Sequence, residues 1–392
     1  MKVLHVTNRY FPELQYGGPP ERIHALCVRL AARGCQSDVL TRHSRLPGGH
    51  AQVNYEGVMV HYLSYWCLAS REIPLPRNEI ARRVQAADLV HIYGLYDLQG
   101  IMAAWLAASR QRPFVLEPMG MFLPIVRSIR KKQLYHATVG QWMIRRAARI
   151  IATSEQEQAE IVSTGVDRDQ VVVRRNGVDL EQFAVLPERS LARHRFGVDD
   201  TSFVFLYLSR LSVKKNPEML LRAFAQLGQP QARLLFVGPE EKEGYTDSLI
   251  QLAGELGIRS QMHFAGPLYG AEKQAAFAAA DVFVLPSSNE NFGNVIAEAI
   301  AAQVPVIITN RCGIAPFVLD RAGLVIDCDE SQLVDAMRAL VDNTDLRLSF
   351  RAAAPQVAAE LSWDHAVDKT VSIYQEILAG QTFLQDKGFA LE

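Results

Sequence analysis

Two basic residues follow the first apolar segment in the second half of the chain. Arg210 and Lys215 lie in the stretch YLSRLSVKKN, directly after the strand-like run FVFL. Side chains at the carboxyl end of a parallel strand are placed to meet a ligand rather than a core, and two cations there suit a diphosphate. The alternative is a solvated surface face, which the two residues alone do not exclude.

Two carboxylates flank a predicted helix start further along the chain, in PSSNENFGNVIAEAI. Glu290 lies in the loop and Glu298 about two turns into the helix, so the two side chains could hydrogen-bond different hydroxyl groups. The backbone N–H groups of Phe292, Gly293 and Asn294 point from the helix start toward any anion bound there. Taken alone, a capping glutamate and a surface glutamate are an equally good explanation.

A glycine pair near the N-terminus is the third candidate segment. Gly17 and Gly18 lie between the apolar run VLHV and a helix that the pattern predicts to stop at Gly34. Glycines let the backbone approach a ligand, and the helix N-terminus that follows offers N–H groups to an anion. A plain tight turn is the alternative, since neither a GxGxxG nor a GxxxxGK[ST] motif is present.

The elements that must position these segments are short apolar runs alternating with helical stretches. The first series is VLHV, DVLT, VMVHYL, LVHIY, FVLE, RIIATS and VVVRRN, and the second is FVFLYLS, LLFVG, MHFAG, VFVLPS, VPVIIT and GLVID. Such runs predict parallel strands covered on both faces, and therefore two doubly wound α/β domains. We place the seam near residue 180, after the NGVD at 176–179, and expect a C-terminal helix over residues 365–392.

Composition narrows the class of protein. The chain has 392 residues, enough for two domains, with 49% hydrophobic and 21% charged residues. Lys and Arg number 41 against 42 Asp and Glu, so no general attraction to nucleic acid is expected. The five cysteines are odd in number and never spaced as CxxC, which indicates reduced thiols. With no signal peptide and no long apolar run, we expect a cytoplasmic enzyme.

The order of these segments resembles glycosyltransferase family 4, the retaining nucleotide-sugar enzymes of GT-B fold. The resemblance covers nearly the whole chain and is strongest over residues 206–325. It implies two Rossmann-like domains that face each other across a deep cleft, with the C-terminal helix crossing back to the first. Residues 1–180 would bind the acceptor and residues 181–364 the nucleotide-sugar donor. Within the family the chain is most similar to exopolysaccharide glycosyltransferases, with the heterocyst-envelope type as the expected pathway.

The resemblance also implies roles for particular residues. Arg210 and Lys215 would hold the diphosphate and stabilise the departing nucleotide, while Glu290 would contact the donor sugar and Glu298 the ribose. Gly17 and Gly18 would close over the phosphates when the acceptor is bound. The remaining expected substrate contacts come largely from backbone groups: Gly266 and Leu268 at the base, and Asn291, Phe292, Gly293, Asn294 and Val295 at the sugar and phosphates.

No cofactor and no metal is expected, because the two cations would do the electrostatic work that a divalent metal does in other glycosyltransferases. An Asp-x-Asp pair does occur at Asp327 and Asp329. It follows the last predicted strand, so we interpret it as a surface turn.

The chain departs from the family pattern in the first half. Members often carry a His in a PHGM-like segment, where this chain has Met119, and a second His where this chain has Tyr93. Met119 neither donates nor accepts usefully. Glu117 and His91 are therefore our candidates for polar groups near the reacting carbon, with Tyr93 as another, although His91 would equally suit a satisfied position on a buried strand.

A cluster of basic residues in the first half of the chain suggests where the acceptor binds. Seven basic residues and no acid occur between residues 127 and 149: Arg127, Arg130, Lys131, Lys132, Arg145, Arg146 and Arg149. On amphipathic helices, this stretch could bind a lipid-diphosphate acceptor or touch an anionic membrane at its inner face. A basic solvated face is the alternative.

These observations lead to one function and two alternatives. The leading hypothesis is transfer of a hexose, glucose from UDP-glucose, to an oligosaccharide or lipid-linked acceptor with retention of configuration. A nucleotide-sugar epimerase or hydrolase of the same fold stays open, as does a sugar-nucleotide-binding protein with little turnover.

Overall fold

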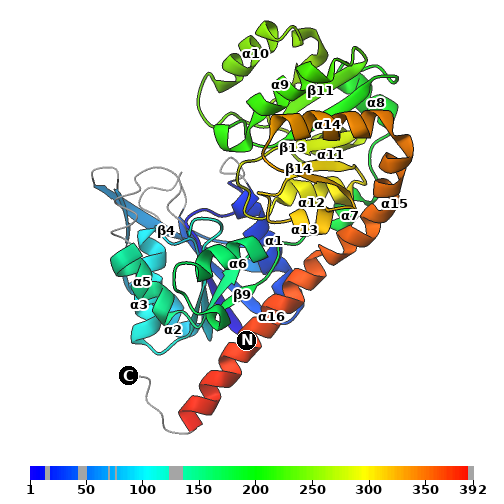
Figure 1. Ribbon diagram of the computed structural model, residues 1–392. Helices are drawn as coiled ribbons and strands as arrows, with labels where there is room; N and C mark the ends of the chain where they lie inside the picture. The colour runs from blue at the N-terminus through cyan, green and yellow to red at the C-terminus, as the bar shows by residue number, and fades with distance from the viewer. Residues whose placement is uncertain (14–17, 43–50, 69–70, 76, 123–135, 387–392) are drawn as a thin grey trace. The chain divides into compact units, whose positions relative to one another are not determined.

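The chain folds into two units, each built on one largely parallel sheet (Figure 1). The N-terminal unit comprises Met1–Asn176 with Trp363–Glu392, and the C-terminal unit comprises Gly177–Ser362. The computed structural model describes residues 1–13, 18–42, 51–68, 71–75, 77–122 and 136–386.

The N-terminal sheet has the strand order β3-β4-β2-β1-β6-β7-β8-β9 over its described residues, with β5 paired to β4. Its strands are β1 (Lys2–Val6), β2 (Gln36–Arg42), β3 (Ala51–Tyr55), β4 (Val58–Leu68), β5 (Arg71–Leu75), β6 (Leu89–Tyr93), β7 (Phe114–Glu117), β8 (Arg149–Ala152) and β9 (Val171–Val173). Helices α1 (Gly18–Ala32), α2 (Arg77–Ala86), α3 (Leu98–Ser109), a π-helical turn (His136–Gly140), α5 (Gln141–Arg146) and α6 (Glu155–Val162) connect them.

Alternate residues of the central strands bury opposite faces of this sheet. In β1, Leu4 packs in the cluster that contains residues of α2 and α3, whereas Val3 packs with residues of α1. In β7, Leu116 packs in the same cluster as Leu4, and Val115 packs in the same cluster as Val3. A strand with both faces covered must be apolar at nearly every position, which is why these runs lack the alternation of a half-exposed strand.

Helix α16 (Trp363–Asp386) closes the face that α1 covers. Trp363, Val367 and Tyr374 are buried with Val3 and Leu30 in one cluster. The guanidinium carbon of Arg29 on α1 also lies 5.4 Å from the ring centroid of Trp363. The C-terminal helix is thus part of the N-terminal core, and the chain enters and leaves the C-terminal unit through two connections.

The C-terminal sheet has the order β12-β11-β10-β13-β14-β15 and is parallel in every recorded pair. Its strands are β10 (Phe203–Leu208), β11 (Ala232–Val237), β12 (Met262–Phe264), β13 (Val282–Leu285), β14 (Val306–Thr309) and β15 (Gly323–Ile326). Its helices are α7 (Leu180–Ala184), α8 (Arg189–Arg195), α9 (Pro217–Leu227), α10 (Tyr245–Glu255), α11 (Gly270–Ala279), α12 (Asn294–Ala301), α13 (Ala315–Val318), α14 (Glu330–Asp342) and α15 (Thr344–Glu360).

The predicted fold class is confirmed, and each predicted apolar run is a strand: seven in the N-terminal unit and six in the other. The prediction missed β3 and β5, which pair antiparallel with β4. Both are short edge segments, and the Pro74 inside β5 argues against a strand in a sequence pattern.

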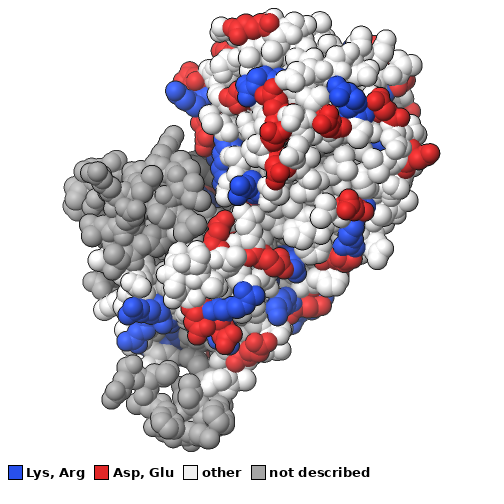
Figure 2. Space-filling view, viewed as in Figure 1, with Lys and Arg blue, Asp and Glu red and all other residues white. Residues whose placement is uncertain are grey.

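Charges of both signs are interspersed over the described surface that Figure 2 shows, in each of the two units. This distribution agrees with the formal net charge of −1 for the whole chain. No helix among the described residues is long and apolar enough to cross a membrane.

Candidate functional site

The loops after β10, β11 and β12 lie side by side at the carboxyl edge of the C-terminal sheet. Leu211 N–H donates to the Pro239 carbonyl at 2.8 Å, and Gly238 N–H donates to the Gly266 carbonyl at 2.8 Å. Arg210 is therefore brought next to the loop after β11, where one of its guanidinium nitrogens lies 3.6 Å from Glu241 Oε1. The second of these hydrogen bonds holds Gly266, two residues before Leu268, at this edge.

Gly238 makes this approach of the loops possible. Its φ is +138°, and a Cβ atom there would lie 2.0 Å from the Ser209 carbonyl oxygen. A distance that short is impossible, so any side chain would push the backbone next to Arg210 away. The position of Arg210 thus depends on a glycine in the neighbouring loop.

Lys215 is held by a second set of contacts at the same edge. It ends the 3₁₀ turn Val213–Lys215, and the carbonyl of Lys214 beside it accepts hydrogen bonds from Ser288 N–H at 2.9 Å and Ser288 Oγ at 3.0 Å. The Lys215 ammonium forms an ion pair with the Glu290 carboxylate. The structure therefore brings together the cation predicted for the diphosphate and the glutamate predicted for the sugar.

The backbone around Glu290 is fixed from both directions. Glu290 N–H donates to the Arg311 carbonyl at 2.9 Å, and Gly313 N–H donates to the Glu290 carbonyl at 2.9 Å. The Phe292 side chain is 2% exposed and belongs to the core, so only its backbone is available to a ligand. Gly293, at φ +105°, caps α12, where a Cβ atom would lie 2.6 Å from Ile296 Cδ1.

Burial, and then the neighbouring Lys214, lower the pKa of Lys215 to about 8. Only 17% of its side chain is exposed, so the charged form has lost much of its hydration. An anion that binds beside the ammonium would therefore stabilise its charged form.

Glu298, the other predicted carboxylate, is also paired. Its Oε1 lies 2.9 Å from Nζ of Lys273, which belongs to the first turn of α11. In the C-terminal unit, each of the two predicted carboxylates is therefore matched by a lysine.

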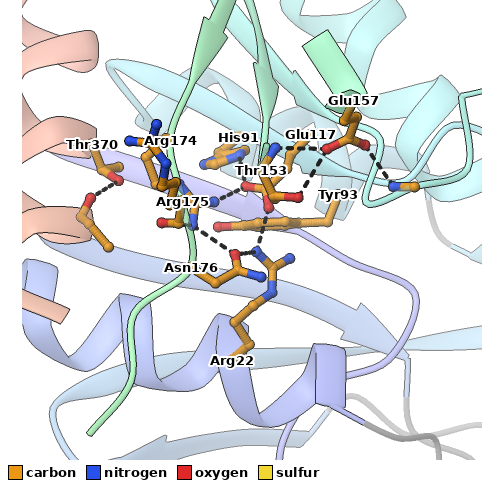
Figure 3. A network of polar contacts seen from close by, with 12 residues as sticks. Arg22, His91, Tyr93, Glu117, Thr153, Glu157, Arg174, Arg175, Asn176 and Thr370 are labelled. Carbon is orange, nitrogen blue, oxygen red and sulfur yellow. Dashed lines mark hydrogen bonds and ion pairs between the residues drawn. The ribbon is translucent and has the colours of Figure 1, made fainter. Parts of the chain in front are cut away.

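A buried network of charges occupies the corresponding edge of the N-terminal sheet (Figure 3). Glu117, at the end of β7, accepts a hydrogen bond from one guanidinium nitrogen of Arg22 at 2.5 Å and another from Arg174. The same Arg22 nitrogen donates to Asn176 Oδ1 at 2.6 Å, and Arg174 also reaches Asn176. Helix α1, β7 and the last residue of the N-terminal unit before the crossing at Gly177 thus share one set of contacts.

His91 extends this network to the C-terminal helix. Its Nε2 lies 3.3 Å from Glu117 Oε2, and its Nδ1 lies 2.6 Å from the Tyr374 hydroxyl on α16. Burial lowers the pKa of His91, so the ring is neutral near pH 7. Because Glu117 can only accept, the arrangement that satisfies both contacts is a proton on Nε2, with Nδ1 accepting from Tyr374.

Glu117 itself stays ionised. Burial alone would raise its pKa, but the charges of Arg174 and Arg22 outweigh burial and hold the pKa well below its ordinary value. Glu117 and His91 have no exposed surface. The catalytic role predicted for them stays a prediction, and their burial argues against it, since a catalytic group must reach the substrate.

The loop that replaces the family's histidine segment is held by another carboxylate. Glu157 on α6 accepts a hydrogen bond from Gly120 N–H at 2.7 Å and from Thr153 N–H at 2.7 Å. Met119 has φ +55°, an uncommon conformation for a side chain of its kind. Gly18 begins α1, and Gly17 lies outside the described residues.

Sequence reasoning missed Arg22, Arg174, Asn176 and Tyr374 as members of this network. One signal was available, because Glu117 and Arg174 each end an otherwise apolar strand-like run. A charge in such a position is either at a site or paired with another charge. Pairing partners far apart in sequence cannot be read from spacing.

The Asp-x-Asp pair caps a helix, as expected for a surface turn. Asp329 accepts from Gln332 N–H at 3.0 Å at the start of α14, and Asp327 accepts from Asn310 Nδ2 at 2.6 Å. Among the described residues, no group of three or more His, Cys, Asp or Glu side chains is arranged to hold a metal ion. Cys27, Cys35, Cys312 and Cys328 are free thiols.

Comparisons with known proteins cover both units. Residues 17–177 match the model of the glycosyl transferase 4-like domain, and residues 188–357 match glycosyl transferases group 1. A D-inositol 3-phosphate glycosyltransferase of Nocardioides sp. is 30% identical over 93% of this chain and 86% of its own length. The chain belongs to glycosyltransferase family 4. A second D-inositol 3-phosphate glycosyltransferase, from Catenulispora acidiphila, is 31% identical over 90% of this family 4 enzyme and 89% of the relative.

Solved structures share the GT-B fold of this family 4 enzyme. HepE of Anabaena in complex with UDP superposes with a TM-score of 0.79 at 19% identity, covering 96% of this chain and 100% of HepE. Sucrose-phosphate synthase of Thermosynechococcus elongatus gives 0.77 at 21% identity, with 97% and 99% covered. At such identities the likeness establishes the fold and leaves the substrates open.

Replacing Glu117 tests the buried network. Glu117→Gln leaves Arg22 and Arg174 buried without a counter-charge, so the free energy of unfolding should fall by about 3–5 kcal/mol. All four tryptophans of the chain belong to the N-terminal unit, so urea unfolding followed by tryptophan fluorescence reports on that unit. Glu155→Gln, which breaks an exposed pair with Arg175, is the control and should cost less than about 1 kcal/mol. Equal effects of the two substitutions would contradict the role given to Glu117.

The lowered pKa of Lys215 predicts how nucleotide binding depends on pH. Below about pH 8 the lysine is already charged, and above it a bound diphosphate must draw a proton onto it. If the diphosphate of a nucleotide binds beside Lys215, the affinity for UDP, measured by calorimetry, should be level up to about pH 8 and then fall by up to tenfold per pH unit. Lys215→Arg keeps the charge at all these pH values and should remove the fall. A wild-type affinity that stays level to pH 9.5 or so would show that Lys215 does not meet the phosphates.

Proposed function

We propose that this glycosyltransferase is a retaining hexosyltransferase that uses UDP-glucose as donor. The observation that carries the proposal is the Lys215–Glu290 pair beside the start of α12, with Arg210 on the same loop as Lys215. Two cations and a helix N-terminus at one sheet edge match a diphosphate, and a carboxylate next to them matches sugar hydroxyls. HepE, which shares the fold, has been solved with UDP, and also with UDP and glucose.

In this proposal, donor binding replaces the Lys215–Glu290 ion pair of the ligand-free site by contacts with the donor. Lys215 leaves Glu290 for the diphosphate, and Glu290 then accepts hydrogen bonds from hydroxyl groups of the hexose. Arg210, which is 47% exposed, turns to the same phosphates. Because the ion pair is made before the donor arrives, neither charge stands unpaired in a partly buried site at any stage.

Backbone groups and Glu298 complete the proposed donor contacts. The sugar and phosphates are contacted by backbone N–H groups at the start of α12 and just before it, those of Asn291, Phe292, Gly293, Asn294 and Val295. Gly266 and Leu268 read the base, and Glu298 binds the ribose.

The proposed reaction needs no nucleophile from the protein. The bond from the anomeric carbon to the diphosphate breaks first, and Arg210 and Lys215 stabilise the negative charge that the departing UDP gains. The acceptor hydroxyl attacks the oxocarbenium-like carbon from the same face, and a phosphate oxygen takes its proton. Configuration is thereby retained, and no metal or cofactor is required.

The acceptor is proposed to be an oligosaccharide or a lipid diphosphate, in exopolysaccharide synthesis of the kind found in heterocyst envelopes. The names of the curated relatives, D-inositol 3-phosphate glycosyltransferases, favour a small phosphorylated polyol as a second candidate. Product analysis with each acceptor separates the two.

A donor panel distinguishes transfer from the two alternative functions. The protein is incubated with several nucleotide sugars without acceptor. Slow release of the nucleoside diphosphate supports a transferase, an isomerised sugar indicates an epimerase, and tight binding without turnover indicates a binding protein. A rise in melting temperature with one nucleotide sugar alone identifies the donor.

Removing either cation tests the proposed donor site. Arg210→Ala and Lys215→Ala should each lower kcat/KM by about 10²–10³-fold, because each removes a charge that the transition state uses. Arg338→Ala, which breaks an exposed pair with Asp335 on α14 of the same unit, is the control and should leave kcat/KM unchanged. Normal turnover in both site variants would refute the assignment.

Contact with an anionic membrane is proposed for the N-terminal unit. Leu98 and Trp105 lie seven residues apart on one face of α3 and are 41% and 50% exposed, and Met121 is 40% exposed. Arg145 and Arg146 are exposed at the end of α5. The basic residues Arg127, Arg130, Lys131 and Lys132 lie outside the described residues. Exposed apolar side chains near cations are typical of an interfacial surface.

Sedimentation with vesicles tests this contact. The protein should bind phosphatidylcholine vesicles that contain phosphatidylglycerol at low salt and be released by salt, since the attraction is screened. Trp105→Ser with Arg145→Glu should abolish binding. Leu191→Ser, an exposed apolar position in the C-terminal unit, should not. Absence of wild-type binding at low salt would remove the membrane from the proposal.

A further inference from the structure

The second lysine–glutamate pair of the C-terminal unit lies beside the segment proposed to read the base. Lys273 is in the first turn of α11, which follows residues 266–268, and Glu298 is on α12. Their side chains are 13% and 21% exposed, and Nζ lies 2.9 Å from Oε1. A lysine withdrawn from water in this way loses hydration and side-chain freedom, which a surface position would have kept.

The residues on either side of Lys273 in sequence, Glu272 and Gln274, contact helices other than α12. Glu272 forms an ion pair with Arg195 on α8, and both are about half exposed. Gln274 Nε2 donates to the Gln182 carbonyl of α7 at 2.6 Å. Helix α11 is thus also held by contacts with α7 and α8, and Lys273 contacts α12.

The pairing holds one oxygen of the Glu298 carboxylate, because Nζ of Lys273 lies 2.9 Å from Oε1. A carboxylate that is fixed in this way keeps one orientation, and hydrogen bonds from hydroxyl groups to it are charge-assisted. The ammonium also offsets a negative charge that would otherwise repel a nucleoside diphosphate.

We infer that Lys273 is a positioning residue for ribose recognition, which holds the Glu298 carboxylate in the orientation that accepts hydrogen bonds from the two ribose hydroxyls. The inference rests on the proposed donor site and adds a residue to it. Lys273 acts through Glu298 and does not contact the reacting atoms. Its removal therefore weakens donor binding without changing the chemical step.

The test compares UDP with 2′,3′-dideoxy-UDP, which lacks both hydroxyls. Calorimetry gives the two affinities for the wild type, Lys273→Met, Lys273→Arg and Glu272→Gln. The wild type should prefer UDP, and Lys273→Met should reduce that preference by about tenfold or more, as expected when hydrogen bonds to a charged group are lost. Lys273→Arg should retain most of the preference. Glu272→Gln, one residue away on the same helix, should leave it unchanged.

Steady-state kinetics and circular dichroism complete the test. Lys273→Met should raise KM for the donor with kcat nearly unchanged, which is the signature of lost binding energy that substrate and transition state share. Unchanged circular dichroism shows that the variant is folded.

The outcomes separate this inference from the proposed function. If Lys273→Met lowers the affinities for UDP and dideoxy-UDP by the same factor, or changes neither affinity, Lys273 does not act on the ribose and the inference is overturned. If the wild type binds both nucleotides equally, the ribose role of Glu298 falls, and the inference with it. If the wild type does not bind UDP, the proposed UDP-sugar donor is wrong.

Discussion

The N-terminal unit depends on keeping one carboxylate ionised inside its core. Glu117 is fully buried, and an ion of that size would not stay charged there without partners. Arg22 and Arg174 supply the charge, and His91 links the same carboxylate to Tyr374 of α16. These partners come from α1, β6, the end of β9 and the C-terminal helix, so the network can form only once all four are in place. It fixes helix α1, which begins at Gly18, and Asn176 at the crossing between units.

The charge pairs of the C-terminal unit differ from this network in how far they are buried. Arg174 and Glu117 have no exposed surface, whereas the Lys215 and Glu290 side chains keep 17% and 19% exposed. A pair that water can reach exchanges partners at modest cost, because each charge is partly solvated during the exchange. A fully buried pair loses several kcal/mol when one partner leaves. The first kind suits a binding site, and the second kind suits a framework.

Family membership follows from sequence likeness over both units, whereas substrate identity follows from neither the likeness nor the fold. The order of the glycine pair, the NGVD segment, the two cations and the two glutamates sufficed to predict a family 4 enzyme. The donor sugar and the acceptor depend on a few side chains and backbone groups that relatives of the same fold vary. The heterocyst-envelope pathway therefore stays a prediction, beside the phosphorylated polyol that the relatives suggest.

The sequence by itself determined the two parallel sheets and the segments at their carboxyl edges, because apolar periodicity and turn residues are local signals. It placed Arg210, Lys215, Glu290 and Glu298 at loop and helix positions that the structure bears out. Tertiary structure alone decided which charges meet. Lys273 contacts Glu298, and Arg22 contacts Glu117, although the partners differ by 25 and 95 in residue number, respectively. Such pairings depend on how strands are ordered in the sheet, and no local pattern encodes that order. The same holds for the complete burial of Glu117.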